Sequence, residues 1–221
     1  MKIDIRILTC DRTRKSDKGV NYIHTTIVNF LSAGGSNNNP VSLYVSHSET
    51  TFVDTYSDKF KIIPADSEVN GNQNFIRACT EPSSSELILV LEDDLEFSSD
   101  FVQKLTFWLD RNNQHLKNNL VTLYTPYIEI NRCLDEGKDM WKYPIDAFYG
   151  TQALLGSRKL FQECGESIRG VHGMLWDMAI KEWMKATGRG LVSTVPCFVQ
   201  HIGVISSLHG QDMHTTSGFL K

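Results

Sequence analysis

The chain has 221 residues, of which 41% are hydrophobic and 22% charged, and its formal net charge is -4. This composition is typical of a globular protein with one substantial core, and the chain is short for two ordinary domains. The negative net charge excludes a global basic field of the kind that drives binding to a nucleic-acid backbone, although it leaves room for a local basic patch. No apolar run reaches the length of a membrane span, and the amino-terminal segment lacks the apolar core of a secretion signal.

The cysteines are odd in number and widely scattered, and no pair of them has CxxC spacing. They are Cys10, Cys79, Cys133, Cys164 and Cys197. This pattern favours free thiols in a reducing compartment over a disulfide framework. We therefore expect a cytoplasmic protein.

Taken in chain order, the hydrophobic pattern predicts strands and helices that alternate. The expected strands cover residues 3–10, 41–46, 60–66, 86–91, 120–126, 147–156 (as one strand or two) and 191–203 (broken by Pro196), and the expected helices cover residues 20–31, 70–80, 101–109, 157–164 and 173–188. Residues 131–145 are charged and indicate an irregular surface excursion. The polar segment from residue 204 to the end predicts a mobile tail.

This alternation predicts an α/β fold: a mostly parallel sheet with helices on both faces, in three layers α/β/α. We expect one domain over residues 1–221. In such sheets ligands bind outside the carboxyl ends of the strands. That rule places "TCDR", after the first strand, and "EDD", after the strand at 86–91, on one edge of the sheet.

The acids Glu92, Asp93 and Asp94 directly follow the apolar run "LILVL" and have no basic neighbour in the sequence. Mg²⁺ and Mn²⁺ take oxygen ligands and are commonly held by one or two carboxylates together with substrate phosphates. The cluster therefore suits a metal-bound nucleoside diphosphate. The alternative is a solvated strand end whose acids favour the start of the next helix.

Four motifs in the same order resemble those of metal-dependent glycosyltransferases of the GT-A (Rossmann-like) fold, most closely N-acetylglucosaminyltransferase I and its relatives. They are "ILTCDR" at 7–12, "LILVLEDDLEFSSDF" at 87–101, "LWDMAIKEWM" followed by "GRG" at 175–190, and "GVISSLHG" at 203–210. The resemblance implies a nucleotide-binding half at residues 1–125, and an acceptor-binding half with a carboxyl-terminal loop at 126–221.

The resemblance also implies roles for individual residues. Asp94 would hold Mn²⁺ or Mg²⁺, and Asp93 would contact the ribose or a metal-bound water. Asp177, in the position of the first aspartate of a Trp-Asp-Asp-Trp helix, would be the general base of an inverting transfer. The implied nucleotide-sugar-binding residues are Asp11, Arg12, His47, Asn72, Asn74, Glu92, Asp93, Trp176, Arg189, Ser206 and His209.

The sequence departs from the family pattern at several positions. Ser46, His47 and Ser48 stand where the family has its uracil-reading aspartate, so UDP is only the default nucleotide. Met178 replaces the second aspartate of the helix, and Asn72 or Asn74 takes the place of a family histidine. The chain is also shorter than those relatives and lacks their membrane anchor, which fits a microbial or viral enzyme acting in the cytoplasm of its host.

Other interpretations of these residues stay open. Asp177 has a possible ion pair with Lys181, four residues on. His201, His209 and His214 have spacings of 8 and 5, which favour surface histidines, or a substrate contact for His209, over a zinc site.

The leading hypothesis is a glycosyltransferase that moves a sugar from a nucleotide-diphosphate sugar to a glycan, lipid-linked or nucleobase acceptor. The local run Lys181, Lys185, Arg189 mildly favours a DNA-modifying enzyme, although a solvated helix face explains it as well. A nucleotidyltransferase would normally carry a glycine-rich loop after its first strand, and "TCDRTRKSDKG" is poor in glycine. The third alternative is a non-catalytic nucleotide- or glycan-binding module.

Overall fold

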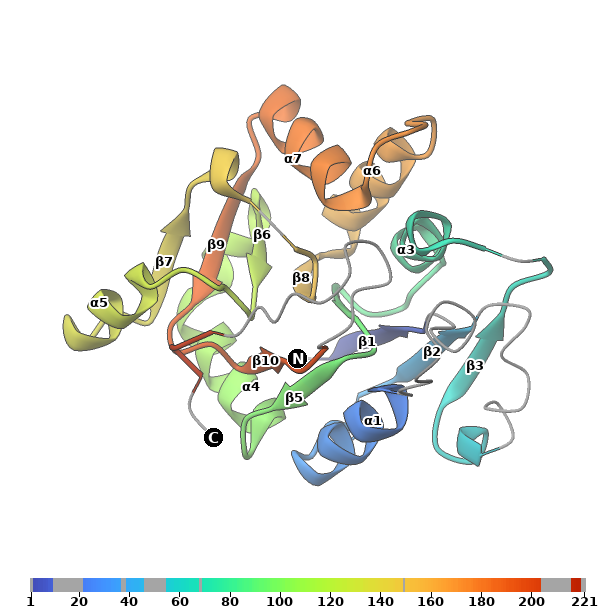
Figure 1. Ribbon diagram of the computed structural model, residues 1–221, viewed down its shortest axis with the longest axis horizontal. Coiled ribbons are helices and arrows are strands. Elements are labelled where there is room, and N and C mark those ends of the chain that lie inside the picture. Colours follow the sequence, from blue (N-terminus) through green and yellow to red (C-terminus); the bar gives the residue numbers. More distant parts are fainter. Residues whose placement is uncertain are drawn as a thin grey trace.

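The computed structural model describes residues 2–9, 22–36, 39–45, 55–67, 69–148, 150–203 and 216–219. Within them the chain forms an eight-stranded sheet with the strand order β3-β2-β1-β4-β8-β6-β9-β7 (Figure 1). The strands are β1 (Ile3–Leu8), β2 (Val41–Val45), β3 (Lys61–Pro64), β4 (Leu87–Leu91), β6 (Asn119–Thr122), β7 (Met140–Tyr143), β8 (Ala153–Ser157) and β9 (Gly190–Thr194).

The sheet is mixed but mostly parallel. Strands β1, β2, β3 and β4 pair in parallel with one another, and so do β6 and β9. Strand β8 runs antiparallel to both β4 and β6, and β7 is antiparallel to β9. Because β8 reverses the direction on each side of itself, β6 and β9 point the same way as β1 and β4. Their carboxyl ends therefore share one edge of the sheet, called the carboxyl rim below.

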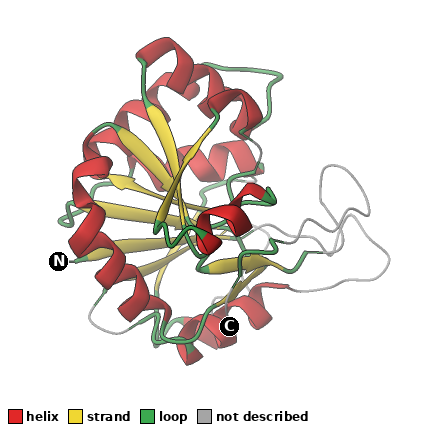
Figure 2. Ribbon diagram, turned by 90° about the vertical axis from the view of Figure 1, so that its left-hand side faces the viewer, coloured by secondary structure: helices red, strands yellow, loops and turns green. Residues whose placement is uncertain are grey.

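Helices cover both faces of the sheet (Figures 1 and 2). One face carries α1 (Tyr22–Ser32) and α4 (Phe101–Asn112), which bury apolar side chains such as Ile27 and Leu105 against β1 and β4. The other face carries α3 (Gly71–Thr80), α6 (Arg158–Ile168) and α7 (Trp176–Thr187) over a second core. This arrangement confirms the expected three-layer α/β/α fold.

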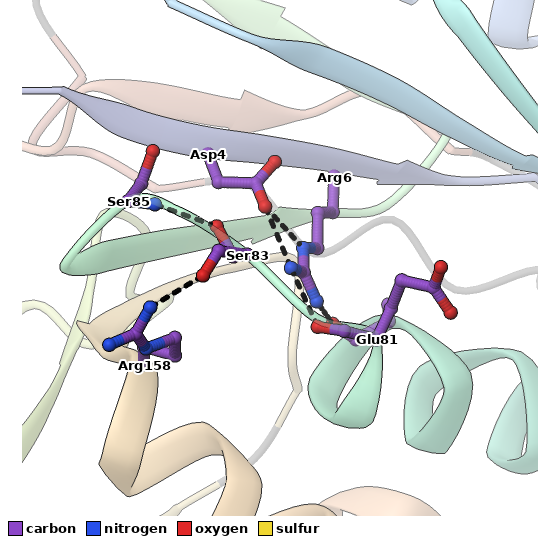
Figure 3. A network of polar contacts seen from close by, with 7 residues as sticks. Asp4, Arg6, Glu81, Ser83, Ser85 and Arg158 are labelled. Carbon is purple, nitrogen blue, oxygen red and sulfur yellow. Dashed lines mark hydrogen bonds and ion pairs between the residues drawn. The ribbon is translucent and has the colours of Figure 1, made fainter.

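Helix α3 is fixed at both ends. At its start Asn70 and Gln73 form a capping box, in which each side chain accepts a hydrogen bond from the other residue's backbone. At its end the guanidinium of Arg6, on β1, donates to the carbonyls of Ala78 and Glu81 and pairs with Asp4 at 2.7 Å (Figure 3). The cation thus satisfies carbonyls that the last helical turn leaves open.

A two-stranded ribbon lies beside the main sheet. It joins β5 (Leu95–Phe97) to β10 (Val199–His201) in antiparallel register. The backbone N–H of Phe198 donates to the carbonyl of Leu123, just beyond β6, so the ribbon is tied to the carboxyl rim. The segment 216–219 returns to this ribbon, where the backbone N–H of Thr216 donates to the side-chain oxygen of Gln200 at 2.8 Å.

One structural prediction was wrong. Residues 131–145 are not irregular, because α5 (Glu129–Asp135), β7 and the start of a 3₁₀ turn, η3 (Ile145–Ala147), account for most of them. A second 3₁₀ turn, η2 (Asn113–Lys117), follows α4. The mobile tail expected from residue 204 onward falls largely outside the described residues.

The four described cysteines are buried and unbridged, as expected, and burial raises the pKa of the Cys164 thiol to about 12. Cys10 lies outside the described residues. Among the helices that the structure describes, none combines the length and the apolar character of a membrane span.

Candidate active site

The acids that follow β4 are largely withdrawn from solvent. Asp93 is 4% exposed and Asp94 is 1% exposed, and Glu92 is half-buried. The hydroxyl of Thr26, on α1, donates to the carbonyl of Asp93 at 2.8 Å and accepts from the N–H of Leu95 at 2.9 Å. One helix side chain therefore fixes the turn that presents the acids. The interpretation of this segment as a solvated strand end does not hold for Asp93 or Asp94.

Asp94 faces a histidine from the far end of the chain. Its Oδ2 lies 3.0 Å from Nε2 of His201, on β10, and its carbonyl accepts from the N–H of Ile202 at 2.9 Å. The His201 side chain is only 11% exposed, so the prediction of a surface histidine was wrong. The antiparallel pairing of β5 with β10 brings the two side chains together, because His201 pairs with Leu95, the residue after Asp94.

Gly203 packs against this pair, and its lack of a side chain makes room for the carboxylate and the imidazole. A Cβ at position 203 would collide with Oδ2 of Asp94 and would come within 2.8 Å of Nε2 of His201. Since that contact is shorter than any real Cβ tolerates, only glycine fits without displacing the carboxylate or the imidazole. Glycine here is thus a requirement of the site.

Glu92 is held by the neighbouring strand. Its N–H donates to the carbonyl of Gln152, at the start of β8, at 2.9 Å. Its carboxylate accepts from the hydroxyl of Thr151 at 2.6 Å. The three acids therefore diverge: Glu92 lies towards β8, whereas Asp94 lies towards β10.

Asp177 lies at the same rim, in the first turn of α7. Helix α6 follows β8 at the amino edge of the sheet and runs towards the carboxyl rim. Helix α7, which comes next in the chain, therefore begins at that rim. The carboxylate of Asp177 is half-exposed and accepts from the N–H of Met178 at 2.8 Å. No ion pair joins Asp177 to Lys181, both of which the structure describes.

Asn72 sets the position of this helix start. Its amide donates to the carbonyl of Met174 at 2.8 Å and its oxygen accepts from the N–H of Trp176 at 3.2 Å. The Trp176 ring packs edge-on against Phe75, with 5.2 Å between centroids. Asn72 and Trp176 thus position Asp177 by fixing the first turn of α7 against α3.

Asn74 has a purely intramolecular set of bonds. Its amide donates to the carbonyls of Thr9 and Tyr44, at the ends of β1 and β2, at 3.1 and 2.9 Å, and its oxygen accepts from Arg77. This arrangement ties α3 to the carboxyl rim, and both amide hydrogens of Asn74 are used in it. We therefore leave Asn74 out of the candidate site.

The structure separates Arg189 from the other candidates. Arg189 precedes β9 and lies at the amino edge of the sheet, where it pairs with Glu163 of α6 at 2.7 Å. Lys185 likewise pairs with Asp146. The basic run Lys181, Lys185, Arg189 is therefore partly neutralised, and it gives no support to a nucleic-acid acceptor.

The remaining predicted binding residues lie outside the described residues. They are Asp11, Arg12, His47, Ser206 and His209. The residues that sequence reasoning missed are Thr26, Thr151, Gln152 and His201, together with the requirement for glycine at 203.

A cation at this site would have few protein ligands. No group of three or more His, Cys, Asp or Glu side chains suited to a metal occurs in the part of the chain that the structure describes. The carboxylate of Asp94 and the imidazole of His201 are nevertheless the kinds of donor that Mn²⁺ accepts, and they lie within hydrogen-bonding distance of each other. The donor set fits a cation that takes its other ligands from a bound diphosphate and water.

No protein-family model matches the sequence, and no curated protein matches it either. Solved structures are similar in fold. A nucleotidyl transferase from Methanothermobacter has a TM-score of 0.56 at 14% identity, with 88% of this chain and 86% of that chain covered. The fold is thus that of a class in which nucleotidyltransferases and GT-A-like proteins both occur.

Two larger structures share the same fold. GalNAc-T7, crystallised with UDP, GalNAc and Mn²⁺, has a TM-score of 0.58 at 10% identity, with 90% of this chain and 43% of that chain covered. TarS from S. aureus has a TM-score of 0.57 at 10% identity, with 92% and 37% covered. These likenesses confirm the GT-A-like α/β fold, and at such identities they carry no statement about substrate.

Proposed function

We propose that the protein is a metal-dependent inverting glycosyltransferase that moves a sugar from a nucleotide-diphosphate sugar, by default a UDP-sugar, to an acceptor hydroxyl. The observation that carries the proposal is the placement of two carboxylate sites on one rim: the buried Asp94 with His201, and Asp177 at the start of α7. The carboxyl rim is where ligands bind in open α/β sheets. The fold it shares with GalNAc-T7 supports the same interpretation.

In this proposal Asp94 and His201 hold Mn²⁺ or Mg²⁺, and Asp93 lies next to them as a contact for the ribose or a metal-bound water. When bound, the ion neutralises the charge that builds on the leaving diphosphate. The protein's contribution is to keep both donors in place. Thr26 fixes the acidic turn, the β5–β10 ribbon brings His201 to Asp94, and Gly203 leaves the space they need.

Asp177 is the proposed general base. The acceptor hydroxyl must lose its proton as its oxygen attacks the anomeric carbon, and a half-exposed carboxylate at the rim is accessible to that proton. Attack from the side opposite the diphosphate breaks the sugar–phosphate bond as the new glycosidic bond forms, which inverts the anomeric configuration. Asn72 and Trp176 act as positioning residues by fixing the first turn of α7.

The two halves of the chain have different tasks in this proposal. Residues 1–125 would bind the nucleotide and residues 126–221 the acceptor, with Asp11, Arg12, His47, Ser206 and His209 as further donor-binding candidates. The halves are not separate bodies, because β8 of the second half pairs along the whole of β4 of the first. The donor and the acceptor would thus meet above one continuous sheet.

A nucleotidyltransferase is the second candidate. The observation that favours it is the similar fold of a nucleotidyl transferase, 86% of which this chain covers. Such an enzyme would join a nucleoside triphosphate to a sugar phosphate and release pyrophosphate. It would share the metal site but would have no need of a base at Asp177.

The test is an assay with two arms. In one, the protein is incubated with Mn²⁺ and a panel of UDP-, GDP- and dTDP-sugars, and the nucleoside diphosphate released as water takes the sugar in place of the acceptor hydroxyl is measured. In the other, nucleoside triphosphates and sugar 1-phosphates are supplied, and pyrophosphate is measured. We expect release in the first arm and none in the second. Pyrophosphate release alone would replace the proposal with the nucleotidyltransferase.

Within the first arm, Asp177→Asn should lower turnover by about 100- to 10,000-fold, the usual contribution of a general base. Donor binding should stay at the wild-type level, because the substitution removes only the proton acceptor. Asp135→Asn, an exposed acid on α5, is the matched control and should have no effect. Wild-type turnover in Asp177→Asn would disprove the proposed mechanism.

A further inference from the structure

Gln152 is a buried polar residue at the carboxyl rim whose side-chain oxygen has no hydrogen-bond partner within the described part of the fold. It stands at the entrance to β8, directly opposite Glu92, whose N–H donates to its carbonyl at 2.9 Å. Only 9% of the residue is exposed. Polar side chains this buried normally have hydrogen-bond partners.

The side-chain oxygen of Gln152 accepts no hydrogen bond from any described residue. Its Oε1 is fully buried, and no partner lies within reach. A buried carbonyl of this kind carries a desolvation cost that a hydrogen-bond donor would remove. The side chain therefore has a fixed place and one open acceptor.

The backbone next to it leaves room for the amide group. Gly150 has φ +81°, a conformation that L side chains rarely adopt, and a Cβ there would collide with Oε1 of Gln152 and lie 2.7 Å from its Nε2. Glycine at 150 thus allows the glutamine amide to lie against the main chain.

The direction of the side chain follows from the strand. Leu154, two residues further along β8, belongs to the core beneath α3, α6 and α7. Gln152 directly precedes β8, and the hydrogen bond from the N–H of Glu92 to its carbonyl continues the pairing of β4 with β8. Because side chains alternate along such a pairing, Gln152 lies on that same face of the sheet. It is the face on which α7 begins with Asp177, and the adjacent Thr151 binds the carboxylate of Glu92.

We infer that Gln152 is a specificity-determining residue of the proposed transferase, and that its Oε1 accepts a hydrogen bond from the sugar of the donor. The inference rests on the proposed function. The group it recognises is a donor on the sugar ring, which is a hydroxyl in a hexose and either a hydroxyl or the acetamido N–H in an N-acetylhexosamine. The inference assigns Gln152 to the sugar alone and not to the nucleotide or its diphosphate.

The test compares the binding of the sugar nucleotide with that of the nucleotide alone. Calorimetric titrations in Mn²⁺ use UDP, UDP-glucose, UDP-galactose, UDP-GlcNAc and UDP-GalNAc. Gln152→Met keeps the length of the side chain and removes the acceptor. We expect about tenfold weaker binding of the preferred UDP-sugar, because one hydrogen bond is lost, and unchanged binding of UDP. The donor that loses most identifies the group, since a loss confined to the acetamido sugars points to their N–H.

Thermal unfolding of the unliganded protein gives a second readout. Gln152→Met removes an unpaired buried oxygen, so its melting temperature should equal or exceed that of the wild type. Thr194→Val is the matched control. Its hydroxyl is also buried without a partner, but it belongs to β9 and to the other sheet face, so the substitution should leave all binding unchanged.

Each remaining outcome decides against the inference. Equal affinity of Gln152→Met and wild type for every UDP-sugar would overturn it and leave the proposed function standing. An equal loss for UDP and UDP-sugars, or a lower melting temperature, would assign Gln152 a structural role. Failure of the wild type to bind any of these sugar nucleotides would remove the proposed function and the inference together.

Discussion

Two buried carboxylates in this protein are paired with basic side chains, and they differ in what surrounds the pair. Asp4 meets Arg6 at 2.7 Å beneath α3 (Figure 3), and Asp94 meets His201 at 3.0 Å at the carboxyl rim. Both carboxylates are nearly inaccessible to water. Burial and pairing alone therefore do not distinguish a functional acid from a structural one.

The surroundings make the distinction. The guanidinium of Arg6 donates to two carbonyls at the end of α3 as well as to Asp4, so its charge completes a helix terminus within the fold. The Asp94 pair caps no helix. It lies where the chain passes from β4 to β5, packed against Gly203, whose lack of a side chain makes room for the carboxylate. The comparison teaches that the first pair stabilises the fold, whereas the second has no such structural role and is the pair to which we assign the cation in the proposed function.

The largest effect on stability is expected at the structural pair. Arg6→Leu leaves Asp4 buried without its cation, and we expect the free energy of unfolding to fall by about 3–5 kcal/mol in denaturant titrations. Arg158→Leu is the control, because this half-buried arginine makes a hydrogen bond to the carbonyl of Ser83 and should cost about 1 kcal/mol. The folded fraction of Arg6→Leu should still bind Mn²⁺ and a UDP-sugar. Loss of that binding at unchanged stability would reverse the assignment of the two pairs.

A smaller and more local effect is expected at Gly203. A methyl group there pushes Asp94 and His201 apart, and overpacking of this kind costs about 1–3 kcal/mol. Gly203→Ala should therefore weaken Mn²⁺-dependent binding of a UDP-sugar by about tenfold or more. Gly170→Ala is the control, since a Cβ at 170 has no neighbour within 4 Å. Equal binding by the two variants would show that the space over Asp94 has no part in holding a cation.

Much of this fold was predictable because its signals are local. The continuous apolar run of β4 predicts a strand buried on both faces, and the helical spacing of Phe101, Leu105 and Trp108 predicts α4. The acids after β4 were correctly placed at the rim by the general behaviour of parallel sheets. In contrast, α5 is short and rich in charge, and β7 has only four residues and lies at the sheet edge, so their pattern resembled a surface loop.

The missed site residues depend on contacts between distant parts of the chain. His201 is 107 residues from Asp94, and only the β5–β10 pairing brings the two together. Gln152 is similarly placed by the register of β8 against β4. The spacing of the histidines did not indicate a functional role for His201. A single glutamine before an apolar strand did not indicate one for Gln152. Sheet register is set by the whole fold, so these residues could not be found from their neighbours in sequence.

The most direct test of the central claim is a calorimetric titration of the wild type and of Asp94→Asn with UDP-sugars, each in the presence and absence of Mn²⁺. The account predicts that Mn²⁺ strengthens binding to the wild type by about tenfold or more and that this gain disappears in Asp94→Asn, while the melting temperature of the unliganded variant stays close to that of the wild type. Binding that is indifferent to Mn²⁺ in the wild type, or a gain that survives in Asp94→Asn, would contradict it.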